Sequence, residues 1–152
     1  MTVYRLVKQS RSLLDGEGSA LFPGRWNCYD VPCIYTAMSP ALAQLEVMVN
    51  LDAWKIFQHV PFVLLHIKIP EKQIRKVLIH ELPSSWDDSF HQVEAQEFGT
   101  TILDNPEILA FSVPSALSIL ERNVIINSRA VDFNQVRVTG RTPFNFDSRL
   151  IR

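Results

Sequence analysis

Alternating hydrophobic and polar residues predict strands in several short segments of the chain. The clearest lies between Pro61 and Pro70, where one face carries Val63, Leu65, Ile67 and Ile69. Thr2 to Val7 and Val31 to Thr36 predict two strands before it. After it, short apolar runs separated by turns predict three more strands, at Ile108 to Pro114, Asn123 to Asn127 and Gln135 to Val138.

A helical pattern begins at Ser39 and Pro40, an N-cap residue followed by proline at the first helical position. Its apolar stripe consists of Ala41, Leu42, Leu45, Met48 and Val49. Glu46 falls about 100° from Leu45, at the edge of this stripe. Phe90 to Leu103 predicts a second helix, which Gly99 weakens. Because strands and helices do not alternate regularly, we expect an α+β domain with mostly antiparallel sheets.

Composition narrows the class of protein. With 152 residues, 47% of them hydrophobic and 20% charged, the chain is expected to form one domain spanning residues 1–152. A net charge of −1 argues against nucleic acid as the primary partner. The chain shows neither a secretory signal nor an apolar run of membrane-spanning length, so we expect a cytoplasmic protein without membrane contact.

Arginine is unevenly distributed. No lysine follows Lys76, whereas six arginines occur from Arg122 onward. This bias fits forked recognition of carboxylate or phosphate, and it fits a solvated arginine face equally well.

Several familiar motifs are absent. No second Cys or His pair stands at ligand spacing from Cys28 and Cys33, so no metal site is predicted and both thiols are expected to be reduced. The segment "DGEGSAL", Asp15 to Leu21, fails as a dinucleotide fingerprint. No His follows Ser115, which excludes a triad in the α/β-hydrolase order.

Three side chains could hold a ligand. Arg25 in "GRWN" suits capture of phosphate or carboxylate, or stacking on Trp26 for packing alone. Tyr35 ends a predicted strand and Glu46 lies one helix later, a junction at which the two can converge. Spacing alone favours a core tyrosine and a solvated glutamate over ligand-binding roles.

Taken in order, the motifs "YRL", "GEGSAL", "GRWN", "IYTA", "LAQLE", "VPSA", "NVIIN" and "PFNFDSRL" resemble the RES domain, from Tyr4 to Leu150. The resemblance implies a core like that of ADP-ribosyltransferases and a bacterial toxin that destroys NAD. It also implies a partner, a helix-turn-helix antitoxin of the Xre type that blocks the site. By this resemblance the principal active-site residues are Arg25, Tyr35 and Glu46, the supporting ones Arg5 and Ser115, and a further candidate Asn127.

The chain departs from the family pattern in places. Pro23 and Asp30 stand where the family usually has glycine, although Asp tolerates a left-handed turn better than most residues. Ser128 and Ala130 replace the usual Pro and His after Asn127, which leaves the role of this segment open.

The resemblance leads us to expect cleavage of NAD at the nicotinamide–ribose bond, with water or inorganic phosphate as acceptor. NAD is then a substrate, and no cofactor is expected. The leaving ring departs neutral, so no general acid is needed and the single carboxylate of Glu46 can suffice, unlike the carboxylate pair of ordinary glycosidases. Tyr35 can face the nicotinamide, Arg25 and Arg5 can neutralise the pyrophosphate, and Ser115 can bind the ribose or amide or position the acceptor.

Two other functions remain open from the sequence. The chain could transfer ADP-ribose to a protein, or it could be a non-catalytic nucleotide-binding or interaction module. The sequence also leaves open whether the chain forms a homo-oligomer.

Overall fold

The computed structural model describes residues 1–51 and 59–150. Within these ranges seven strands form one sheet in the order β4-β5-β6-β2-β1-β3-β7. The strands are β1 (Thr2–Lys8), β2 (Ile34–Ala37), β3 (Phe62–Lys68), β4 (Ile74–Lys76), β5 (Ala110–Pro114), β6 (Arg122–Ile126) and β7 (Arg137–Phe144). All neighbouring strands pair antiparallel except β4 and β5, which are parallel. The predicted α+β class with a mostly antiparallel sheet is confirmed.

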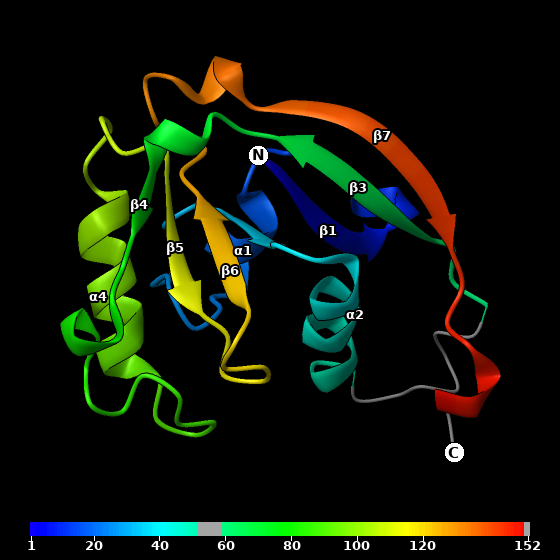
Figure 1. The fold of residues 1–152 in the computed structure, drawn as a ribbon, viewed down its shortest axis with the longest axis horizontal. Coiled ribbons are helices and arrows are strands. Elements are labelled where there is room, and N and C mark those ends of the chain that lie inside the picture. The colour runs from blue at the N-terminus through cyan, green and yellow to red at the C-terminus, as the bar shows by residue number, and fades with distance from the viewer. Residues whose placement is uncertain (52–58, 151–152) are drawn as a thin grey trace.

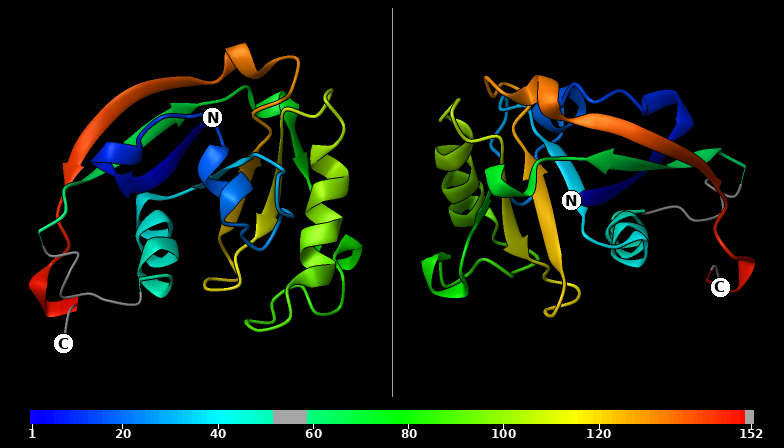
Figure 2. Two further views of the ribbon diagram at one scale, coloured as in Figure 1. Left: turned by 180° about the vertical axis from the view of Figure 1, so that it is seen from behind. Right: turned by 45° about the horizontal axis from the view of Figure 1, so that its top comes forward.

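Helices pack against this sheet. The helices are α1 (Glu17–Leu21), α2 (Pro40–Val49) and α4 (Val93–Leu103). Figure 1 shows α4 alongside β4 and β5, while α2 lies below β1, and the views of Figure 2 agree. The region between α2 and α4 is bordered by the end of β5, the start of β6 and the turn that joins them.

The predicted apolar face of β3 is confirmed. Val63, Leu65 and Ile67 lie in one core cluster with Val3 and Ile34. Phe62 and Leu64 lie in another cluster, with Leu6, Leu42 and Ala43, beneath α2. Because successive strand residues point to opposite faces, β3 supplies the core on both sides of the sheet.

The predicted strand boundaries differ most from the structure at β2 and β7. β2 begins at Ile34 rather than Val31, because Asp30 adopts a left-handed conformation with φ of 65°. Asp30, where the RES domain pattern usually has glycine, thus adopts a left-handed turn, as expected. β7 begins at Arg137 because Phe133–Gln135 form a 3-10 turn, and it continues through Pro143. Proline is tolerated there because β7 is an edge strand.

The second predicted helix starts three residues late. The Asp88 carboxylate accepts hydrogen bonds from the backbone N–H groups of Phe90 and His91, which holds this segment in a turn before α4. These bonds lower the pKa of Asp88. Gly99 lies within α4, and a Cβ there would be 2.1 Å from the Trp26 carbonyl oxygen. The glycine that weakens the helix is what lets α4 contact the turn containing Trp26.

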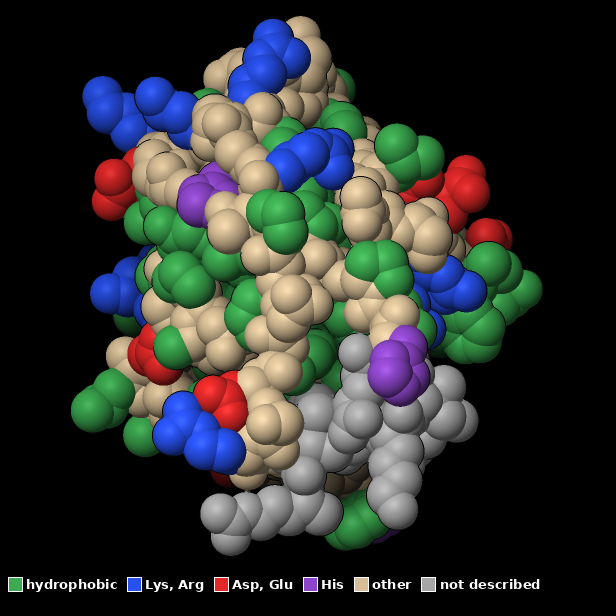
Figure 3. All heavy atoms as spheres, turned by 90° about the vertical axis from the view of Figure 1, so that its right-hand side faces the viewer, with side chains coloured by type: hydrophobic (Ala, Val, Ile, Leu, Met, Phe, Trp, Pro, Cys, Tyr) green, Lys and Arg blue, Asp and Glu red, His purple; other side chains and the backbone are tan. Residues whose placement is uncertain are grey.

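The arginines of the C-terminal part have separate partners. Arg129 pairs with Asp104, and Arg149 with Asp147. Arg141 bonds Ser12 Oγ, and Arg122 bonds the carbonyls of Val77 and Ser112. On the face shown in Figure 3, Lys and Arg are spread among other side chains rather than gathered together. For the described residues, the solvated-face interpretation is the better one.

None of the helices in the described ranges has the length and apolar character needed to cross a membrane.

Candidate active site

Glu46 lies on the side of α2 that faces the sheet. Leu42 and Ala43, one turn earlier, are the buried residues of the helix. Glu46 follows them by four and three positions, and side chains at this spacing share a face. Leu45 and Val49 are 42% and 60% exposed, so the predicted apolar stripe through them is wrong. The glutamate is thus turned inward, and the leucine beside it points outward.

Two side chains donate hydrogen bonds to one oxygen of Glu46. Ser115 Oγ lies 2.9 Å from Glu46 Oε1, and Asn123 Nδ2 lies 2.6 Å from the same atom. Glu46 Oε2 accepts no hydrogen bond from the described residues. The carboxylate is therefore fixed through one oxygen, and its other oxygen is left available.

Ser115 is held by the turn between β5 and β6. Its backbone N–H donates to the Glu121 carbonyl at 3.0 Å. Its Oγ accepts from the N–H groups of Leu117 and Ser118 at 3.1 and 3.3 Å. Since both contacts use the oxygen as acceptor, the hydroxyl proton is directed at Glu46.

The sheet register places Tyr35 on the same face as Asn123. Tyr35 pairs with Ile125 on β6, and Ala37 pairs with Asn123. Directly opposed residues, and residues two apart along a strand, share one face of a sheet. Tyr35 is therefore a diagonal neighbour of the asparagine that holds Glu46.

The Tyr35 hydroxyl is fully engaged within the protein. It donates to Asn27 Oδ1 at 2.6 Å and accepts from the Trp26 N–H at 2.9 Å. Burial raises the pKa of this hydroxyl well above its ordinary value, and the nearby Cys33 raises it further. Because the neutral hydroxyl already makes two hydrogen bonds within the protein, the ring is the part of Tyr35 available to a ligand.

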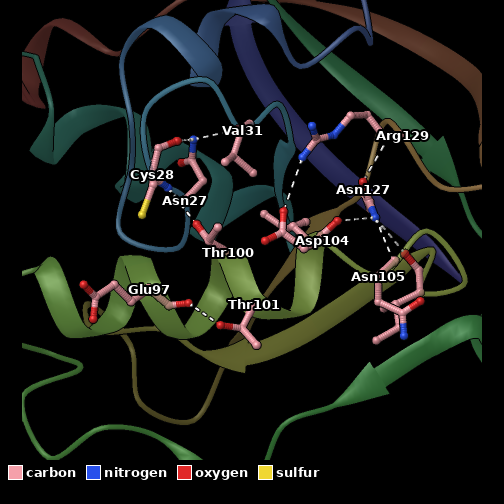
Figure 4. A network of polar contacts seen from close by, with 12 residues as sticks. Asn27, Cys28, Val31, Glu97, Thr100, Thr101, Asp104, Asn105, Asn127 and Arg129 are labelled. Atoms are coloured by element: carbon pink, nitrogen blue, oxygen red, sulfur yellow. Dashed lines mark hydrogen bonds and ion pairs between the residues drawn. The ribbon is translucent and has the colours of Figure 1, made fainter.

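Asn27 organises the turn that contains Arg25. It is completely buried. Its Oδ1 also accepts from the Gly24 N–H, and its Nδ2 donates to the carbonyls of Ser19 and Val31. Figure 4 shows Asn27 and Cys28 near α4, where Thr100 Oγ1 accepts from the Cys28 N–H at 2.9 Å. The turn is therefore fixed to β2 through Tyr35 and to α4 through Thr100.

Arg25 tethers the segment before α4. Its Nη1 donates to the carbonyls of Trp86 and Asp88, both at 2.7 Å. Trp26 instead stacks on Trp86, with ring centroids 6.3 Å apart. In the described part of the chain, Arg25 Nη2 and Nε have no hydrogen-bond partner, so the guanidinium keeps donors for a ligand.

Arg5 is a half-buried cation on β1. Its Nη1 is buried without a hydrogen-bond partner in the described ranges. Desolvation lowers the pKa of Arg5, while Asp15 and Cys33 act in the opposite direction. An incompletely bonded buried charge is costly, so this nitrogen is suited to receiving an acceptor from a ligand.

A family model described as the RES domain matches residues 2–147. The chain belongs to the RES domain family. One relative is the "Toxin Res" of Photorhabdus laumondii, 36% identical over 100% of this chain and 98% of its own length. Another is the "Prs ADP-ribosylating toxin" of a Sphingobium strain, 28% identical over 91% of this chain and 87% of its own.

A solved structure shares the fold of this RES domain. It is the Mycobacterium tuberculosis MbcT–MbcA toxin–antitoxin complex, with a TM-score of 0.78 at 19% identity. The match covers 95% of this chain and 84% of the other.

Asn127 lies apart from the other site residues of this RES domain. It is the last residue of the motif "NVIIN", which begins at Asn123, and it directly follows the last residue of β6. The Asn127 Nδ2 donates to the carbonyls of Leu103, Asn105 and Ile108, and its Oδ1 accepts from the Arg129 N–H. Figure 4 shows it among residues that follow α4. These bonds hold the connection between α4 and β5, and a role toward a ligand stays a prediction.

Asn27 and Asn123 were not singled out by the sequence analysis. Both lie in motifs that carry the family resemblance, "GRWN" and "NVIIN". The available signal was a polar amide next to residues predicted to be buried, because such an amide must find partners. What those partners are depends on contacts between distant segments.

Proposed function

We propose that this RES domain is the toxin of a toxin–antitoxin pair and cleaves NAD at the nicotinamide–ribose bond, passing ADP-ribose to water or inorganic phosphate. The observation that carries the proposal is that the carboxylate of Glu46 is fixed by Asn123, on the sheet face that also carries Tyr35. The 36% identity to a protein named "Toxin Res" supports the assignment as a toxin.

Glu46 is proposed to stabilise the ribose carbon as the nicotinamide leaves. The departing ring carries a positive charge that is neutralised on departure, so positive character builds up on the sugar. A carboxylate opposite that carbon stabilises it electrostatically. Oε1 is occupied by Ser115 and Asn123, and Oε2 is the atom available for this role.

Tyr35 is proposed to bind the nicotinamide through its ring. A cation over an aromatic face is favourable by roughly 0.5–2 kcal/mol. The engaged hydroxyl supports this assignment over acid–base chemistry, since it already donates to Asn27.

Arg5 and Arg25 are proposed to bind the pyrophosphate. Arg5 has a buried nitrogen without a partner, and Arg25 has donors beyond the one that holds Trp86 and Asp88. Charge-assisted hydrogen bonds to phosphate are among the stronger hydrogen bonds in proteins, so these residues can neutralise the pyrophosphate of NAD without a metal. No cofactor is part of the proposal, because NAD is the substrate.

The proposed partner is an antitoxin of the Xre type, with a helix-turn-helix domain, that blocks this site. The solved relative of this fold is a toxin–antitoxin complex, which supports a protein partner. Co-expression tests the partner: a genomic neighbour with a helix-turn-helix should copurify and abolish NAD loss. A neighbour that copurifies without inhibition would contradict occlusion of the site.

A second candidate is transfer of ADP-ribose to a protein. The relative named "Prs ADP-ribosylating toxin" is 28% identical over 91% of this chain, which favours this alternative for a RES domain. The two candidates share the first half of the reaction and differ in the acceptor.

Chromatography of the products distinguishes these functions. NAD is incubated with the purified chain in phosphate, in a phosphate-free buffer, and with a bacterial lysate containing labelled NAD. Free ADP-ribose or its phosphorylated form supports the first proposal, and label on a protein supports the second. Intact NAD in all three, with binding retained, would identify a non-catalytic binding module.

A further inference from the structure

The side-chain amide of Asn123 uses its nitrogen in a hydrogen bond, while its oxygen has no partner among the described residues. Its Nδ2 lies 2.6 Å from Glu46 Oε1, and its Oδ1 is buried without a partner among the described residues. An ionised carboxylate only accepts hydrogen bonds, so the amide nitrogen must face Glu46 and the oxygen must point elsewhere.

Two fully buried asparagines behave differently from the half-buried Asn123. Asn27 and Asn127 each use both the nitrogen and the oxygen of the amide, and their partners are mainly backbone groups. Their side chains hold turns together. The Asn123 side chain has Glu46 as its one hydrogen-bond partner among the described residues, so its amide does not serve the backbone in this way.

Asn123 lies on a strand that is held from both sides. It pairs with Ala37 on β2 and with Val113 on β5. A side chain on such a central strand is positioned more rigidly than one on a loop. Asn123 therefore fixes Glu46 from the sheet, while Ser115 bonds the same oxygen from the turn after β5.

We propose that Asn123 is a positioning residue for Glu46, and that its empty Oδ1 accepts a hydrogen bond from a ribose hydroxyl or the carboxamide N–H of the bound nucleotide. The inference rests on the proposed function. It assigns two tasks to the two ends of one amide, and the task of the nitrogen can be removed while the oxygen is kept.

Two substitutions separate the tasks. Asn123→Asp keeps the Oδ1 acceptor but places a negative charge against Glu46, whereas Asn123→Ala removes both ends. Asn134→Asp, at an exposed asparagine in the 3-10 turn before β7, is the matched control for added charge. Steady-state kinetics with NAD and thermal unfolding are measured for all four proteins.

We expect kcat to fall at least roughly tenfold in both Asn123 variants, as the loss of coupling between contacting residues predicts. KM for NAD should rise in Asn123→Ala and stay within about twofold of the parent in Asn123→Asp. Asn134→Asp should match the parent. If Asn123 had only a structural role, both variants would lower the unfolding temperature, and their KM values for NAD would not differ in this way.

Activity of either Asn123 variant within about twofold of the parent would overturn the inference. So would a loss of activity that follows the loss of folded protein in both variants. A parent protein that leaves NAD intact is a different result, because it overturns the proposed function and the inference with it.

Discussion

Ser115 Oγ donates a 2.9 Å hydrogen bond to Glu46 Oε1, although 69 positions separate the two residues. The serine belongs to the turn after β5, and the glutamate to α2. The contact connects two motifs of the family that carry little meaning separately. It holds the carboxylate of a helix glutamate whose own sequence context is ordinary.

Ser115→Ala should lower both the turnover of NAD and the stability of the fold. The substitution removes one of the two donors to Glu46 and leaves the N–H groups of Leu117 and Ser118 without their acceptor. We expect kcat to fall roughly 10- to 100-fold, and the free energy of unfolding by about 1–3 kcal/mol. Ser118→Ala, three residues along the same turn, is the control and should change neither quantity appreciably. Equal activity of Ser115→Ala and the parent would exclude Ser115 from positioning Glu46.

Arg5→Met should weaken NAD binding without destabilising the empty protein. Arg5 is a half-buried cation whose Nη1 is buried without a hydrogen-bond partner among the described residues, and replacing such a charge by an apolar side chain of similar length is often neutral or stabilising. We expect an unchanged or higher unfolding temperature together with a KM for NAD raised roughly tenfold or more. Thermal unfolding with and without NAD checks both statements. A large loss of stability in the absence of NAD would show that Arg5 serves the fold instead.

Gly99→Ala should destabilise the protein strongly. Its Cβ would lie 2.1 Å from the Trp26 carbonyl oxygen, a backbone atom that cannot move without disturbing the turn at Arg25. We expect a loss of about 3 kcal/mol or more in the free energy of unfolding, at the upper end for overpacking. Gly18→Ala is the matched control, because no atom lies within 4 Å of its added Cβ. Denaturant unfolding of both variants measures the difference. An equal loss of stability in Gly99→Ala and Gly18→Ala would contradict the close contact between Gly99 and Trp26.

Alkaline pH should unfold the protein partly through Cys33. Burial raises the pKa of this thiol from 9.0 to about 11, and its hydrogen bond with Ser19 offsets part of the effect. The thiol stays neutral in the folded chain between these values but ionises in the unfolded chain, so stability is full below pH 9 and decreases as the pH rises toward 11. The loss from this group amounts to about 2–3 kcal/mol.

Denaturant unfolding between pH 8.5 and 10.5 measures this dependence. Cys33→Ala should show a shallower loss of stability with pH than the parent, and Cys28→Ala, at the half-buried cysteine, is the control. Tyr35 adds a decrease of the same sign, because burial also raises the pKa of its hydroxyl. Identical slopes in the parent and Cys33→Ala would contradict the assignment.

The strands were largely predictable from the sequence because alternation reports burial directly. β3 shows this best, since the residues of its predicted apolar face all lie in one core cluster. β7 was predictable only at its start, near Val138, because the rest of this edge strand contains Gly140 and Pro143 and has a weak pattern of its own. Its existence depends on pairing with β3.

The sequence indicated candidate residues for the site but not their geometry. The apolar stripe of α2 suggested that Glu46 lies at its edge, whereas the helix buries Leu42 and Ala43 and turns Glu46 inward. Leu45 fits a hydrophobic stripe by type, but which side of a helix faces the sheet is decided by tertiary packing. Likewise, the composition around Arg25 could not show that its Nη1 holds two backbone carbonyls more than 60 positions away.

Cleavage of NAD is the central claim, and release of nicotinamide is its most direct measurement. The purified parent and Glu46→Gln are incubated with NAD, and free nicotinamide is quantified by chromatography over time, with thermal unfolding confirming that both are folded. We predict that the parent releases nicotinamide and that Glu46→Gln slows the release by roughly 100-fold or more, as expected for loss of a charge that stabilises the transition state. A parent that releases no nicotinamide in phosphate or in phosphate-free buffer, or a Glu46→Gln variant as fast as the parent, would contradict the proposed mechanism.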